Sequence, residues 1–208
     1  MPRGDVVAPA ADWWWSLSAV IGDYVLSCPA RRAARALAAT AGQPGVYVYY
    51  FNHQPRRTIN AWPTSLYGAF HGAEVPWVFY DEVELTGEDE LALSQNMVQY
   101  WVNFAYGGDP YRPVPGQQQP PPLPAFPRYG GGGDSDSGDN GDVYVVFGDN
   151  VLKKGAGNAK QAGARLGWKG AQPPHQQQQQ QLPVQNITTV TGLKSGKCAF
   201  WDMYERNG

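Results

Sequence analysis

The N-terminal part of the chain carries two apolar stretches that predict helices. The first helix is expected from Trp13 to Val25 and should end near Gly22-Asp23. A second is expected from Ala30 to Ala41, because this stretch is rich in Ala, Arg and Leu, which are strong helix formers. Ser27-Cys28-Pro29 suits its start, since Pro costs little in the first turn of a helix, and Gly42 is placed to end it.

A different pattern follows at Val46 to Phe51, where every residue is β-branched or aromatic. No polar residue alternates with them, which is typical of a strand that is buried on both faces in a parallel sheet covered by helices. Val143 to Phe147 predicts a second, short strand.

Two further helices are predicted after the first strand. One opens at Thr86 to Asp89, with Thr86 as the N-cap and acidic residues in the first turn. Its apolar residues recur at steps of four and three, which predicts one buried stripe made of Leu93, Met97, Trp101, Phe104 and Ala105. The other helix is expected from Lys197 to Tyr204. Together with the strands, these elements indicate part of an α/β domain whose other strands are missing.

Two low-complexity stretches interrupt this order and are expected to be disordered. Pro113 to Asp142 contains runs of Gln, Pro and Gly and an acidic Asp/Ser/Gly segment. Gly155 to Gln185 includes the uninterrupted glutamine run Gln176 to Gln181. Neither stretch offers enough apolar surface to offset the conformational entropy that is lost on ordering.

Composition and charge exclude several classes of function. The 208 residues carry a net charge of −2 and no Lys/Arg cluster larger than a pair, which argues against a nucleic-acid binder held by phosphate contacts. No apolar run reaches the roughly 18 residues that a transmembrane helix needs, so no membrane span is expected. The N-terminus also lacks the apolar segment of a secretory signal peptide.

The two cysteines, Cys28 and Cys198, lie far apart in the sequence. Zinc sites bring their ligands in close pairs, so no metal is expected, and no other cofactor is indicated. Two separately buried thiols and a disulfide both remain open at this point. A disulfide would require an oxidising compartment.

Three histidines are the candidates for acid–base chemistry. His175 lies in the glutamine-rich stretch, and His53 follows the first strand and is interpreted as a hydrogen-bonded structural residue. His71 lies on the loop beyond that strand, where α/β sheets gather their active sites, and it is therefore the candidate catalytic residue. The nearby Glu74 is interpreted as a structural acid rather than as a partner in catalysis.

A nucleophile for such a histidine is not found, because the sequence contains no Gly-x-Ser-x-Gly elbow. One further motif, Asn186-Ile187-Thr188, fits the sequon for N-glycosylation, which matters only if the chain is secreted.

A series of segments occurs in a characteristic order: Gly22–Pro29 (GDYVLSCP), Val46–His53 (VYVYYFNH), Phe70–Phe79 (FHGAEVPWVF), Leu93–Ala105 (LSQNMVQYWVNFA), Gly108–Pro110 (GDP) and Cys198–Asp202 (CAFWD). Together they closely resemble the C-terminal part of type-B carboxylesterases, the family of cholinesterases and related lipases. The resemblance covers about Gly22 to Pro110 and then a few short islands.

The resemblance implies an α/β-hydrolase fold and a Ser–His–acid esterase mechanism. His71 matches the family's catalytic histidine in its His-Gly-x-Glu context and would take the proton from the nucleophilic serine. Cys28 and Cys198 match the positions of a family disulfide, which implies a secreted or extracellular protein. In the family, the nucleophile, the oxyanion-hole glycines and the acid lie upstream of the Cys-Pro motif. They are therefore expected to be absent here, and the chain alone is expected to be inactive.

The same resemblance divides the chain into five parts. Residues 1–112 are expected to form the family's C-terminal region with the catalytic-type His71, and residues 113–142 a Gln/Pro/Gly-rich insert. Residues 143–152 would hold a short strand of the same domain, 153–192 a Gly/Gln-rich insert and 193–208 the C-terminal helix.

Two hypotheses of function follow. In the first, the chain is the C-terminal piece of a serine carboxylesterase, which would act on a small carboxylic ester once completed by its upstream part. In the second, it is a piece of a non-catalytic relative, like the adhesion members of this family, in which the fold binds protein partners. An intact His71 favours the enzyme hypothesis, because a binding protein has no need of it.

Overall fold

The computed structural model of the chain describes residues 9–42, 44–57, 68–116, 123–130, 141–148 and 187–206. Its helices and strands are, in chain order, α1 (Pro9–Gly22), η1 (Asp23–Ser27), α2 (Cys28–Ala38), β1 (Tyr49–Phe51), α4 (Val75–Val78), α5 (Glu88–Gly107), β2 (Val143–Phe147), β3 (Ile187–Thr191) and α6 (Ser195–Arg206).

The chain forms two compact units, and each is considered by itself. The first unit consists of residues 1–48, 126–145 and 189–208, and it includes α1, η1, α2 and α6. The second consists of residues 49–125 and 146–188, and it includes β1, α4 and α5. No helix in the described part of the chain is both long enough and apolar enough to cross a membrane.

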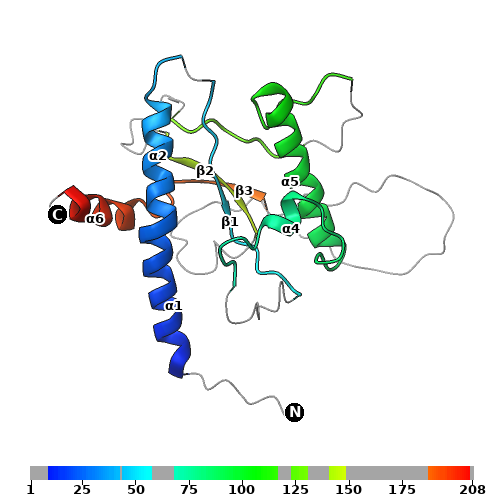
Figure 1. The fold of residues 1–208 in the computed structure, drawn as a ribbon. Helices are drawn as coiled ribbons and strands as arrows, with labels where there is room; N and C mark the ends of the chain where they lie inside the picture. The colour runs from blue at the N-terminus through cyan, green and yellow to red at the C-terminus, as the bar shows by residue number, and fades with distance from the viewer. Residues whose placement is uncertain are drawn as a thin grey trace, which may run out of the picture. The chain divides into compact units, whose positions relative to one another are not determined.

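The expected break between the first two helices does not occur. α1 runs through the π-helical segment η1 into α2, and Figure 1 shows one uninterrupted blue helix. Gly22 and Ser27 both have helical backbone angles, and Ser27 makes no capping hydrogen bond with its side chain. The prediction of a helix end near Gly22-Asp23 is therefore wrong. The wider turn of η1 ends directly before Cys28-Pro29, so the helix continues past Pro29, which has no N–H to donate.

The predicted strand at Val46 to Phe51 is present but shorter, as β1. The backbone carbonyl of Val48 accepts a hydrogen bond from Val145 N (3.0 Å), and Asn52 N donates to the carbonyl of Phe147 (2.7 Å). The residue numbers rise together along the two strands, so the expected parallel pairing is confirmed. The expectation of burial on both faces is wrong, because Tyr49 is 37% exposed and β1 lies at one end of the strand order β1-β2-β3.

The long helix α5 is present, but its start and its buried face differ from the expectation. Gly87 rather than Thr86 occupies the N-cap position. Tyr100 is fully buried, whereas the expected Phe104 is 48% exposed and Ala105 is also exposed. A step of three from the buried Met97 selects Tyr100, whose hydroxyl donates to the carbonyl of Pro124 (2.7 Å). The contact with Pro124, outside the helix, thus accompanies burial of the Tyr100 side of α5.

Two stretches are expected to be disordered, and the structure describes part of the first, where residues 123–130 and 141–142 are folded. Phe126 and Tyr129 are buried, and Gly130 N donates to the carbonyl of Gly141 (2.7 Å). The expected insert over residues 153–192 contains β3, whose end meets the start of β2 through a Gly192 N to Asp142 carbonyl bond (2.8 Å). The expectation of disorder is wrong for residues 123–130 and 141–142, where Phe126, Tyr129 and Asp142 are buried. Residues 117–122, 131–140 and 155–185 lie outside the described residues.

The short strand β2 and the C-terminal helix α6 confirm the sequence predictions at Val143 to Phe147 and Lys197 to Tyr204. β3 pairs with β2 in the opposite direction, so the three strands form a mixed sheet in the order β1-β2-β3.

A disulfide joins α2 to α6 in the first unit. Cys28 and Cys198 have Cα atoms 5.2 Å apart and form an S–S bond, and their exposed fractions are 0% and 1%. Of the two alternatives that the sequence left open, the structure has the bridge.

The polar centre of the first unit is Asp142, directly before β2. One carboxylate oxygen accepts two hydrogen bonds from Arg31 (2.8 and 2.5 Å), and the other accepts the hydroxyls of Tyr129 (2.6 Å) and Tyr144 (3.0 Å). The two tyrosines pack with Ala34 into a small core. Burial opposes the charge on Asp142, but the bonds from Arg31 and Tyr129 outweigh it and lower the pKa of Asp142. Burial and the bond to Asp142 raise the pKa of Tyr129 to about 12.

The disulfide should contribute strongly to stability. We expect the Cys28→Ser/Cys198→Ser double variant to lose about 2–5 kcal/mol of unfolding free energy, because a long unfolded loop is no longer closed. Urea unfolding measures the loss, and the reduced wild-type chain should lose a similar amount. Recovery of both cysteines as free thiols, in non-reducing peptide mapping of chain made in an oxidising compartment, would contradict the bridge.

The lowered pKa of Asp142 predicts a pH dependence of stability. Its contribution should be fully present above the unfolded-state pKa of about 3.9 and should disappear as the pH falls through the lower folded-state value. The difference in unfolding free energy between wild type and Asp142→Asn should therefore shrink between about pH 6 and about pH 2. The exposed Glu82→Gln variant is the matched control, and an equal pH dependence in both comparisons would contradict the assignment.

Candidate functional site

His71 lies at the start of a tight turn that leads into α4. Its side chain is exposed, and the turn is closed by backbone hydrogen bonds from Ala73 N to the Phe70 carbonyl (3.0 Å) and from Val75 N to the Gly72 carbonyl (3.3 Å). Gly72 has a φ of +85°, a backbone conformation that side chains rarely adopt, so glycine is needed to make this turn. The turn therefore presents an imidazole to its surroundings from a defined backbone.

Trp77 anchors the turn to the rest of the second unit. It is fully buried, and its carbonyl accepts a hydrogen bond from the Ser94 hydroxyl on α5 (2.6 Å). Its ring packs against the rings of Phe51 and His53, with centroids 5.2 Å away in each case. α4 thus lies against α5, as Figure 1 shows, and His71 is only six positions from a residue that is held on three sides.

His53 packs against the ring of Trp77 and is itself held by Glu90. Its Nε2 lies 2.8 Å from Glu90 Oε1, which also accepts the backbone N–H of Arg56 (3.0 Å), while Glu90 Oε2 accepts the backbone N–H of Thr86 (2.7 Å). Burial opposes the charge on Glu90, but these three donors outweigh it and lower its pKa. The interpretation of His53 as a hydrogen-bonded structural residue is confirmed.

The end of β2 closes the other side of His53. A Cβ atom on Gly148 would lie 2.4 Å from His53 N, so only glycine permits this approach. Sequence reasoning missed Gly148, Glu90, Ser94 and Trp77 as supports of the site. The acidic first turn of α5 is the one signal in the sequence for Glu90.

Glu74 follows His71 in the same turn. Its backbone carbonyl accepts the N–H groups of Trp77 (2.9 Å) and Val78 (3.1 Å), which starts α4. Burial and, second, the negative charge of Glu74 raise the pKa of the Tyr49 hydroxyl, so this carboxylate acts on β1. The effect of its carboxylate on Tyr49 fits the structural interpretation of Glu74.

An exposed imidazole on a fixed turn can accept a proton from a nucleophile that is brought within hydrogen-bond reach, and return it to a leaving group. Within the described ranges, no group of three or more His, Cys, Asp or Glu side chains is placed to hold a metal ion. His175 and Asn186 lie outside these ranges.

Comparison with known proteins adds the evolutionary context. A sequence model of the carboxylesterase family matches residues 9–133, which include the His71 turn and α5. Acetylcholinesterase of Gallus gallus is 36% identical over 117 residues, which cover 55% of this chain and 15% of that protein. Acetylcholinesterase 1 of Caenorhabditis elegans is 32% identical over 110 residues, which cover 51% of this chain and 17% of that protein. The chain thus spans only about a sixth of the length of these relatives.

The support of the turn can be tested through Glu90. We expect Glu90→Gln to cost about 1–3 kcal/mol of unfolding free energy, because a neutral amide replaces a buried carboxylate that accepts three hydrogen bonds. Amide hydrogen exchange of Trp77 should accelerate at the same time, since His53 would no longer be held against its ring.

The matched control is Asp89→Asn, one position earlier on the same helix. Asp89 pairs with Arg56, and the two side chains are 36% and 52% exposed, so its loss should cost less than about 1 kcal/mol. Equal effects of the two variants on stability and on Trp77 exchange would contradict the support assigned to Glu90.

Proposed function

Because the chain belongs to the carboxylesterase family, we propose that it supplies the histidine-bearing part of a serine carboxylic-ester hydrolase, with His71 as the general base. The family implies an α/β-hydrolase fold. The parallel pairing of β1 with β2 and the helices of both units agree with that architecture.

One observation carries the proposal: the family match includes a histidine whose side chain is exposed on a turn that is anchored at Trp77. A general base must be reachable by the hydroxyl it deprotonates, and its position must be fixed. His71 meets both requirements. His53, buried and bonded to Glu90, does not.

In the proposed mechanism, His71 takes the proton from a serine hydroxyl as the serine attacks the ester carbonyl. The imidazolium then returns the proton to the departing alcohol, and a carboxylate orients and stabilises the ring. The sequence contains no Gly-x-Ser-x-Gly elbow, so the nucleophile comes from a further part of the protein in this proposal. The oxyanion hole and the acid come from there as well, and the 208 residues alone are inactive.

The substrate is a small carboxylic ester. The relatives are named acetylcholinesterases, which favours an enzyme, and no described residue favours the alternative of a non-catalytic binding protein. The Cys28–Cys198 bridge supports a secreted or extracellular location, because disulfides persist in oxidising compartments.

The proposal predicts where activity resides. The 208-residue chain should not hydrolyse p-nitrophenyl acetate above the buffer rate, whereas the longest natural polypeptide that contains it should. In that longer protein, His71→Ala should lower kcat by roughly 10⁴–10⁶-fold, because the serine loses its base.

The control is His175→Ala, which removes a histidine from the glutamine-rich stretch and should leave kcat unchanged. Full activity of His71→Ala in the longer protein would overturn the role of His71. Serine-directed inhibition of the 208-residue chain itself would show that its nucleophile lies within this sequence.

A further inference from the structure

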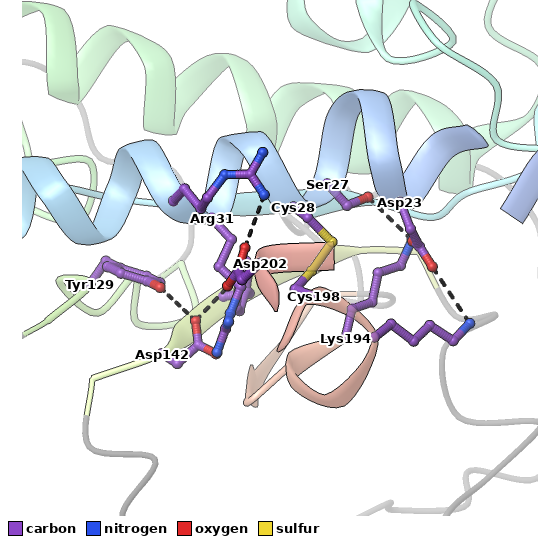
Figure 2. The surroundings of a disulfide bond; sticks show 12 residues. Asp23, Ser27, Cys28, Arg31, Tyr129, Asp142, Lys194, Cys198 and Asp202 are labelled. Carbon is purple, nitrogen blue, oxygen red and sulfur yellow. Dashed lines mark hydrogen bonds and ion pairs between the residues drawn. A yellow bond between two sulfur atoms is a disulfide. The ribbon is translucent and has the colours of Figure 1, made fainter. Parts of the chain in front are cut away.

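Two ion pairs lie on either side of the disulfide in the first unit. Asp23 and Lys194, which precede the two cysteines in the sequence, form one pair. Arg32 and Asp202, which follow the cysteines, form the other, with Arg32 Nη1 2.9 Å from Asp202 Oδ1. Figure 2 shows Asp23 and Lys194 on one side of the S–S bond and Asp202 on the other. None of these four charges takes part in the proposed esterase site.

The spacing of the charges matches on the two segments. Asp23 and Arg32 stand about one helical turn before and after Cys28, and Lys194 and Asp202 stand four positions before and after Cys198. Side chains about four positions apart share one face of a helix, and Lys194 stands directly before α6, where its carbonyl accepts the Cys198 N–H (2.9 Å). The observed ion pairs then place a charge, a cysteine and a second charge in a row on each segment.

The order of the charges is opposite on the two segments. From the N-terminal end, the η1–α2 row reads acid, cysteine, base, whereas the α6 row reads base, cysteine, acid. When the two segments run in the same direction, Asp23 meets Lys194 and Arg32 meets Asp202, and both contacts are attractive, as observed. If α6 were reversed, Lys194 would meet Arg32 and Asp202 would meet Asp23, and both contacts would be repulsive.

The ion pair at the Asp23 end is buried, which strengthens the attraction between its charges. The side chain of Asp23 is 3% exposed, and Lys197 also approaches it, at 3.6 Å. Lys194 Nζ donates a second bond to the Ser27 hydroxyl (3.2 Å). The Arg32–Asp202 end is more open, with side-chain exposures of 34% and 19%. The Tyr24 and Trp201 rings pack together 5.0 Å apart, so apolar contact accompanies both pairs.

We propose that these paired charges fix the orientation and register in which α6 docks on η1–α2, and so bring Cys198 to Cys28 before the bond forms. The cysteines are 170 positions apart, so an unguided loop would bring the two thiols together only rarely. Arg32 and Asp202 are positioning residues for the oxidation: they orient the two helices and take no part in the reaction of the sulfur atoms.

The bond then forms by ordinary thiol–disulfide exchange with a small disulfide oxidant such as oxidised glutathione. One cysteine thiolate attacks the oxidant, forms a mixed disulfide and releases one glutathione thiolate. The second cysteine thiolate attacks the cysteine sulfur of the mixed disulfide and displaces the other glutathione. The two cysteines are oxidised, the oxidant is reduced to two glutathione thiols, and those thiols take up the two protons that the cysteines lost.

Charge exchange tests the proposal in the full chain. The reduced protein is mixed with oxidised glutathione, quenched by alkylation at set times, and the intramolecular disulfide is measured by mass spectrometry. We expect Arg32→Glu alone to slow conversion of the mixed disulfide about 3- to 10-fold, and Arg32→Glu/Asp202→Arg together to restore the wild-type rate.

Arg35→Glu is the matched control, because Arg35 is an exposed arginine one turn further along α2, and its rate should stay at the wild-type value. At the buried end, Lys194→Arg should retain the rate and Lys194→Gln should lower it. If Arg32→Glu alone fails to fold, the rate of disulfide formation in Arg32→Glu/Asp202→Arg tests the proposal instead. A double variant as slow as the single one, or a single variant as fast as wild type, overturns the proposal.

Discussion

The disulfide between Cys28 and Cys198 is the constraint on which the first unit depends, because it ties α6 to α2. Both sulfur atoms are buried, and charged and aromatic contacts lie around them. Close to it, Arg31 on α2 reaches Asp142 at the start of β2. One helix, α2, therefore holds both α6 and the start of β2.

In the second unit, tertiary contacts hold the short turn that carries the exposed His71. A four-residue helix such as α4 has little stability of its own. It is fixed by Trp77, and Trp77 is fixed from below by His53, Ser94 and Phe51. The buried carboxylate of Glu90 completes this support, because it satisfies His53 and the backbone of two loops at once. Rigidity thus comes from tertiary contacts with α5 and β1 rather than from the turn itself.

The two histidines illustrate how environment assigns roles to identical side chains. His53 is enclosed, lies against Gly148 and is bonded to a carboxylate, so it serves packing. His71 is exposed on a fixed backbone, which suits proton transfer with a group supplied from elsewhere. The chain spans about a sixth of the length of the acetylcholinesterases that it is similar to, which fits the proposal that the rest of the site is supplied from another part of the protein.

Local pattern in the sequence determined the existence and type of most elements, because propensity, periodicity and strand composition are short-range properties. It placed β2, α5 and α6 and the parallel pairing of β1, and the order of its motifs indicated the family and the disulfide. It failed where long-range partners decide the outcome. Tyr100 is buried and donates to Pro124, whereas Phe104 is exposed, and Tyr129 is held by its hydrogen bond to Asp142 and its ring contact with Tyr144. The helix continues through Asp23 to Ser27 where local residues indicated a stop, and Lys194, distant in sequence, pairs with Asp23 there. His71 could be named from its motif, but its support by Trp77, Ser94, His53 and Glu90 could not, since those residues become neighbours only when strand and helices pack together.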